Sequence, residues 1–148
     1  MSNYNATKGL VYIKDTTHTP AVNWKFPLKY IRYESYKATP NQNQDLNSTV
    51  DTAGNLHRYP LDHTRSKVEF STPVLKSADV KTIMDALSYR WNKASERKVS
   101  IEYYNPLTDS YGSGSFYIPD IDFTIMNVND TTNGEIMYQE TRIAFIEY

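Results

Sequence analysis

Apolar and polar side chains alternate over most of the chain, which predicts β-strands, because successive side chains of a strand point to opposite faces of a sheet. In residues 99–103, for example, we expect Val99, Ile101 and Tyr103 to face inward. The segments predicted as strands cover residues 9–14, 28–36, 64–72, 99–103, 115–118, 121–125 and 136–147. Since proline has no backbone N–H to donate, Pro73 and Pro119 should end the strands that precede them.

One stretch follows the helical period instead. Its apolar positions lie three and four residues apart and are Val80, Ile83, Met84, Leu87 and Trp91. This spacing predicts an amphipathic helix over about residues 78–91 that buries one face. Ser77 is a suitable N-cap, and Asp79 in the first turn would be favoured by the helix dipole.

The segment at about residues 39–57 is nearly free of apolar side chains and rich in Asn and Gln. Loops of more than about 12 residues in a compact domain are usually functional or disordered. We therefore expect a long polar loop or hairpin, inserted into a single domain that spans residues 1–148.

These elements together predict seven to eight strands joined by short turns, with a single helix among them. Because no regular helices separate the strands, a doubly wound parallel fold is disfavoured. The expected fold is mainly β with one α-helix, either an antiparallel β-sandwich or a curved sheet flanked by the helix.

Composition narrows the possible functions. The 148 residues include no cysteine, which excludes disulfides, thiolate nucleophiles and cysteine-ligated zinc. A net charge of −1 argues against sequence-independent binding of nucleic acid, which needs clustered Lys and Arg. The N-terminus shows no signal-peptide pattern and no apolar run approaches a membrane span, so we expect synthesis in the cytoplasm and no membrane insertion.

Candidate chemistry is sparse. His18, His57 and His63 lie in polar stretches without the spacing of a metal site, although His57 and His63 could meet if a hairpin joined them. Asp120 and Asp122 would share one face of a strand, which leaves a hydrolase as a weaker hypothesis. We therefore expect no catalytic residue, no cofactor and no metal.

The 13 tyrosines are the most unusual feature of the composition. Tyrosine suits half-buried strands, is enriched at protein interfaces, and can stack on sugars. All three uses remain open at this point.

Four segments in the second half follow one another in a recognisable order. They are Thr64-Arg65-Ser66-Lys67-Val68-Glu69-Phe70; Pro73 and the helix from Ser77 to Trp91; Val99-Ser100-Ile101-Glu102-Tyr103-Tyr104-Asn105-Pro106; and Gly114-Ser115-Phe116-Tyr117-Ile118-Pro119-Asp120 with the closing Ile143-Ala144-Phe145-Ile146-Glu147-Tyr148. Over Thr64 to Tyr148 the chain resembles small tail structural proteins of phages and prophages of Gram-positive bacteria, of the tail-tube or distal-tail kind.

The resemblance implies a non-enzymatic virion protein of the tail tip, baseplate or tube end. It would form a ring of six copies, dock onto other tail proteins and bind no specific nucleic acid. The candidate interface residues are Tyr4, Trp24, Gln42, Asn47 and Tyr111. The alternative is a carbohydrate- or receptor-binding β-sandwich module that uses Trp24 and exposed tyrosines.

Overall fold

The computed structural model describes residues 2–50, 52–54, 56–130 and 134–148, with the backbone alone described for 41–50 and 56–64. Within these residues the fold is mainly β with one α-helix, which confirms the fold class predicted from the sequence. In chain order the elements are β1 (Val11–Lys14), β2 (Trp24–Lys25), β3 (Lys37–Val50), β4 (Leu56–Ser71), β5 (Leu75–Lys76), α1 (Ser77–Tyr89), β6 (Lys98–Asn105), β7 (Ser110–Tyr117), β8 (Ile125–Asn129), β9 (Glu135–Tyr138) and β10 (Arg142–Glu147). Two short 3-10 helices, Leu28–Tyr30 and Ala94–Glu96, complete them.

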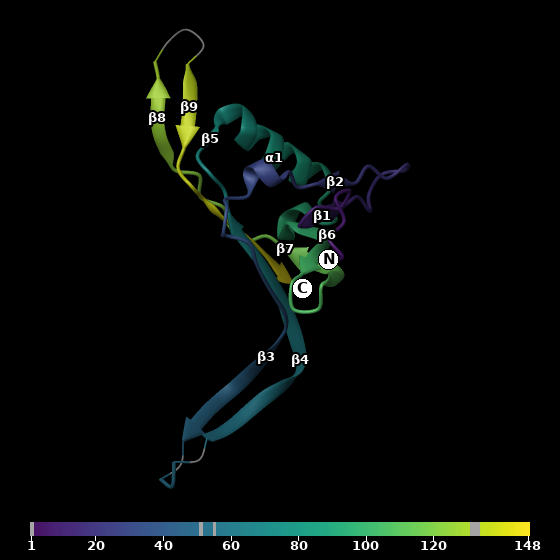
Figure 1. Cartoon of the computed structure of the whole chain (residues 1–148), viewed down its shortest axis with the longest axis vertical. Helices are drawn as coiled ribbons and strands as arrows, with labels where there is room; N and C mark the ends of the chain where they lie inside the picture. Colours follow the sequence, from purple (N-terminus) through teal and green to yellow (C-terminus); the bar gives the residue numbers. More distant parts are fainter. Residues whose placement is uncertain (1, 51, 55, 131–133) are drawn as a thin grey trace.

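The strands form two antiparallel sheets. The larger sheet has the order β2-β1-β6-β7-β10-β4-β3, and the smaller has the order β5-β9-β8. Two hairpins leave the body at opposite ends of the molecule, β3–β4 at one end and β8–β9 at the other (Figure 1). Of the segment at 39–57, residues 39–50 lie in β3 and residues 56–57 in β4, and these strands pair as a hairpin.

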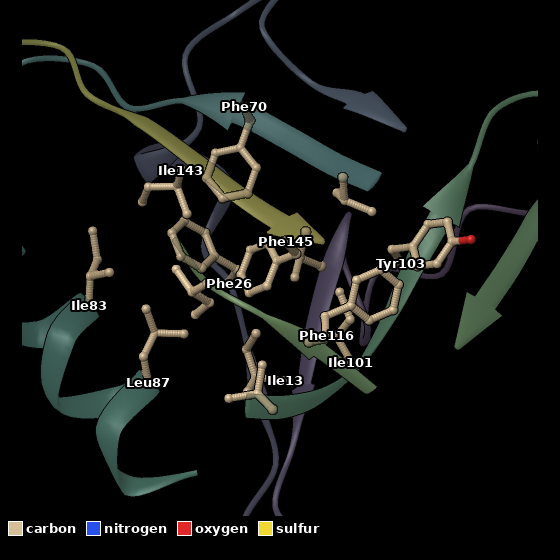
Figure 2. Packing of buried hydrophobic residues seen from close by; sticks show 14 of the residues in the cluster. Ile13, Phe26, Phe70, Ile83, Leu87, Ile101, Tyr103, Phe116, Ile143 and Phe145 are labelled. Carbon is tan, nitrogen blue, oxygen red and sulfur yellow. The ribbon is translucent and has the colours of Figure 1, made fainter. Parts of the chain in front are cut away.

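The core lies between α1 and one face of the larger sheet. Val99, Ile101 and Tyr103 of β6 are buried as their alternation predicts. From the helix, Ile83 and Leu87 are fully buried and point toward Phe26 (Figure 2). Each fully buried aliphatic side chain stabilises the fold by about 1.5–3 kcal/mol, so the burial of Ile83 and Leu87 in the shared core holds the helix on the sheet.

The helix begins one residue away from the predicted cap. Ser77 is its first helical residue and Lys76 takes the cap position, so the N-cap prediction for Ser77 was wrong. The carboxylate of Asp79 accepts the backbone N–H of Lys76 at 3.3 Å, which satisfies one of the donors left free at the helix start. Trp91 lies just beyond the last helical residue and packs against the core.

Residues 28–36 are not a strand, although they alternate. They begin with the 3-10 helix Leu28–Tyr30, which buries Tyr30. Glu34 then adopts a φ of 64°, a left-handed conformation that a strand does not allow. A turn therefore replaces the expected strand and delivers the chain to β3.

Two of the later predicted strands also have different bounds. The strands predicted over 99–103 and 115–118 are longer, because β6 extends to Asn105 and β7 already begins at Ser110. Residues 121–124 form no strand; Ile121 and Phe123 pack irregularly against the core, and pairing starts at Ile125.

The expected final strand over residues 136–147 is two strands in different sheets. The chain crosses between the sheets at Thr141. There the backbone N–H of Thr141 donates to Thr72 Oγ1 at 3.1 Å, and the N–H of Thr72 donates to the carbonyl of Thr141 at 2.8 Å. This reciprocal pair fixes the end of β9 and the start of β10.

Candidate interaction surfaces

The outer part of the β3–β4 hairpin is a two-stranded ribbon. β10 pairs with β4 only from Lys67 to Ser71. Beyond that point, within the described residues, β3 and β4 pair only with each other, from Gln42 opposite Arg65 to Val50 opposite Leu56. At about 3.3 Å per residue, residues 42–50 of β3 span roughly 30 Å. The ribbon projects away from the body of the molecule (Figure 1). We call residues 42–50 with 56–65 the ribbon.

Charged side chains gather where the ribbon leaves the body. Arg142 Nε donates to the carboxylate of Glu69 at 2.6 Å, and Lys67 lies 3.5 Å from the same carboxylate. Partial burial opposes ionisation of Glu69, but these two cations outweigh it and lower its pKa. Arg32 and Lys37 join Glu69 and Arg142 around a polar hollow of about 200 Å³.

The smaller sheet exposes apolar side chains on its outer strand, β8. Ile125 is 52% exposed, Met126 46% and Val128 50%. Ile125 lies opposite Tyr138, and Val128 lies opposite Ile136, with a register shift between Ile125 and Asn127. Exposed apolar groups of this kind, when they adjoin one another, mark interaction sites.

Tyr4 and Tyr111, two of the predicted interface residues, lie in one aromatic cluster with Tyr104. The ring of Tyr104 meets Tyr4 edge-on at 6.2 Å and Tyr111 at 5.8 Å. The hydroxyl of Tyr111 donates to the carbonyl of Gly9 at 2.6 Å. Burial, followed by the nearby Tyr111, raises the pKa of Tyr4. These contacts tie the N-terminal segment to the β6–β7 hairpin of the same chain.

The other three candidate residues lie elsewhere. Trp24 in β2 is half-buried and meets Phe26 edge-on at 5.2 Å. Gln42 and Asn47 belong to β3 by their backbone, and their side chains lie outside the described residues. The sheet order separates β2 from β3 by the full width of the larger sheet, so Trp24 does not join the ribbon.

Asp15 organises a site that was not predicted from the sequence. Its carboxylate is fully buried and accepts backbone N–H groups of Thr17 at 3.0 Å and Val22 at 3.1 Å. His18 Nδ1 lies 3.0 Å from the same carboxylate, and the His18 ring stacks on Tyr89 at the end of α1. Burial opposes ionisation of Asp15, but the hydrogen bonds outweigh it and hold the pKa well below its usual range.

The same loop is joined to the helix end by Arg90. Arg90 is buried, and its Nε donates to the carbonyl of Val22 at 2.8 Å. Asp15 followed by Thr17 is a pattern typical of an Asx turn. This pattern was the one signal in the sequence for the hydrogen-bond network around Asp15. The network fixes residues 15–23 against α1.

Among the described side chains, those considered for chemistry are not assembled into a site. Asp120 and Asp122 are exposed, and Asp120 lies 2.7 Å from Arg97 in a surface ion pair. The described residues contain no group of three or more His, Cys, Asp or Glu placed to hold a metal ion. The side chains of His57 and His63 lie outside that description. Among the described helices none has the length and apolar character of a membrane span.

Comparisons with known proteins give one clear match. The model of a family of unknown function, DUF6711, matches residues 21–148. No curated protein matches the sequence significantly.

Two solved structures are similar at low identity. One is described as the tail of an empty GTA particle computed with helical refinement and C6 symmetry, with 17% identity, 98% of this chain and 94% of that chain covered, and a TM-score of 0.47. The other is described as the virion of a native gene transfer agent (GTA) particle, with 15% identity, the same coverages and a TM-score of 0.46. Both similarities are weak, so the role of this chain rests on its own sequence and geometry.

Proposed function

We propose that this chain, which belongs to the DUF6711 family of unknown function, is a non-enzymatic structural subunit of a phage-like tail. It acts by binding other copies of itself and other tail proteins. We further propose that it forms a hexameric ring at the tube end, tail tip or baseplate, and that it resides in the virion.

The ribbon is the observation that carries this proposal. A two-stranded hairpin without a third strand or a covering layer is at best marginally stable in water. In the part of the chain that the structure describes, the outer edge of β3 also has no strand beside it, and such edges readily accept a strand from another chain. A neighbouring subunit that covers the ribbon would stabilise the hairpin and would also occupy its open edge. Both effects favour a chain that functions inside an assembly.

The sequence resemblance over Thr64 to Tyr148 supports a tail in particular. A head-to-tail contact between different surfaces of identical subunits generates a ring when its rotation closes. The two hairpins at opposite ends of the molecule suit such a contact better than a symmetric dimer (Figure 1).

Shortening the ribbon tests the proposal. Residues 43–64 are replaced by Asn-Gly, a dipeptide that closes two-residue hairpins, so that Gln42 and Arg65 remain the last pair. We expect an unchanged thermal unfolding midpoint, because the core lies outside the ribbon, and a loss of oligomers in native mass spectrometry. When the gene is deleted from the genome that encodes it, the shortened protein should fail to restore tails seen by electron microscopy.

Leu107→Ser, at an exposed position in the turn between β6 and β7, serves as the surface control and should restore tails. Normal tails from the shortened protein would contradict the importance of the ribbon. Absence of the wild-type chain from purified particles, measured by mass spectrometry, would overturn the structural role itself.

A further inference from the structure

The apolar surface of β8 continues the core rather than standing apart from it. Leu75 of β5 is buried and lies opposite Tyr138 of β9, which in turn lies opposite Ile125 of β8. Residues directly opposite one another in a sheet share a face. The same face therefore passes from a buried leucine through a half-buried tyrosine to an isoleucine that is 52% exposed.

A register shift in β8 enlarges this face. Between the pairs Ile125–Tyr138 and Asn127–Met137, β8 has one residue more than β9, which is a bulge at Met126. As a result Val128 lies opposite Ile136, on the same face as Ile125. In a regular strand, residues three positions apart, such as Ile125 and Val128, would point to opposite faces. Two half-exposed β-branched side chains thus lie side by side at an unpaired edge.

β8 and the β3 strand of the ribbon each leave one edge open for pairing with a further strand. Among the described residues, β8 forms the edge of a three-stranded sheet and has no strand on its outer side, and β3 forms the edge of the larger sheet. Within its otherwise polar sequence, the ribbon part of β3 contains two apolar residues, Leu46 and Val50. The two edges lie at opposite ends of the molecule, so β8 and the ribbon of one copy cannot meet (Figure 1).

Charge disfavours the symmetric pairing of β8 with β8 of another copy. Residues 120–140 contain five Asp and Glu and no Lys or Arg. Glu135 pairs with Lys76, and Glu140 pairs with Arg32, whereas Asp122 and Asp130 make no ion pair with the described residues. Two such segments side by side would repel each other. The ribbon segment 42–65 is nearly neutral, with three Asp against two Arg, and two His besides.

We propose that β8 of one copy pairs through its open edge with β3 in the ribbon of a second copy. The small sheet and the ribbon would then form one continuous intermolecular sheet, with Ile125 and Val128 removed from water. This inference rests on the proposed self-association and names the surface that receives the ribbon. Because the two edges differ, the contact is head-to-tail and continues from copy to copy.

Cysteine cross-linking tests the pairing, and the native chain has no cysteine to interfere. Val128→Cys is combined in turn with Gln42→Cys, Asp45→Cys and Ser48→Cys, all in the part of β3 that belongs to the ribbon. After mild oxidation of assembled protein, we expect intermolecular disulfides in at least one pair, since bridged cysteines need Cα atoms within about 7 Å. The control pair is Lys81→Cys, on the exposed face of α1, with Gln42→Cys, which should remain uncross-linked.

A second experiment tests the same strand, β8, by substitution. Val128→Lys places a charge on the edge, and we expect self-association to weaken at least about tenfold, which corresponds to about 1.4 kcal/mol. Leu107→Lys, at an exposed apolar position in the β6–β7 turn, should leave association unchanged. Both are measured by analytical ultracentrifugation, with circular dichroism to confirm folding.

The outcomes separate this inference from the proposed function. Assembly with no disulfide in any of the three pairs, and with equal association of Val128→Lys and Leu107→Lys, would overturn the β8–β3 pairing while leaving self-association intact. A chain that stays monomeric alone and is absent from particles would overturn the proposed function, and the pairing with it.

Discussion

The hydroxyl of Tyr111 should determine how firmly the N-terminal segment is held. In Tyr111→Phe the ring remains, so its edge-on contact with Tyr104 at 5.8 Å is kept. The hydrogen bonds of the hydroxyl are lost. Its one proton is donated to the carbonyl of Gly9 at 2.6 Å, with the carbonyl of Asn5 also within reach at 3.3 Å, and its oxygen accepts the Asn5 backbone N–H at 3.1 Å, so one donated and one accepted bond disappear.

The expected magnitude follows from these two bonds. A typical intramolecular hydrogen bond contributes about 0.5–1.5 kcal/mol net, and the site is half exposed, so the loss should total about 1–2 kcal/mol. That free energy corresponds to a roughly 5- to 30-fold larger population of the open segment. Because the segment lies outside the core, the loss should appear as local opening and not as global unfolding.

Amide hydrogen exchange measures this opening directly. The N–H groups of Lys8 and Gly9 donate to the carbonyl of Asn5 at 3.1 and 2.8 Å, and they should exchange faster by the same factor. Tyr117→Phe is the control, since its ring meets Tyr148 edge-on instead, at 6.1 Å. Exchange at Lys8 and Gly9 within about twofold of the wild-type rate would refute the assignment, because even 1 kcal/mol gives about fivefold.

Three further predictions concern stability. Leu87→Ala removes a fully buried side chain beside an existing cavity of about 110 Å³, and chemical denaturation should show a loss of about 2–5 kcal/mol. Gly112→Ala would place a methyl group 2.7 Å from the buried ring of Tyr103, so denaturation should show a loss of about 1–3 kcal/mol. Asp15→Asn should be less stable than wild type at neutral pH. Since the pKa of Asp15 is lowered in the fold, the stability it adds is complete above its unfolded pKa of about 3.9 and is lost as pH falls further. Melting curves of the two proteins should therefore converge in acid, and a gap that is constant with pH would contradict the role of the charge.

Local patterns predicted the elements whose environment is uniform along their length. The helix kept its apolar face because Ile83 and Leu87 meet one continuous core. The alternation of β6 held for the same reason, since one side of that strand faces the core throughout. The candidate interface could be predicted only as a polar insertion, because no local signal indicates that its strands pair beyond the body.

Contacts between distant parts of the chain decided the rest. Residues 136–147 divide between two sheets because Thr141 bonds Thr72, and no pattern within the segment contains that partner. Tyr111 was predicted as an interface residue, yet its described hydrogen bonds hold the N-terminal segment of its own chain. Asp15 is a similar case, since its neighbour Arg90 comes from the end of α1.

The sequence by itself determined the periodicities, and with them the class of fold, the buried face of the helix and the polar character of the ribbon. The tertiary structure decided which edges stay open and where the two hairpins point. The physical reason is that periodicity reports the average environment of a segment, whereas an open edge is defined by the strand that does not lie beside it. That information is carried by the sheet order, in which β3 and β8 each come last.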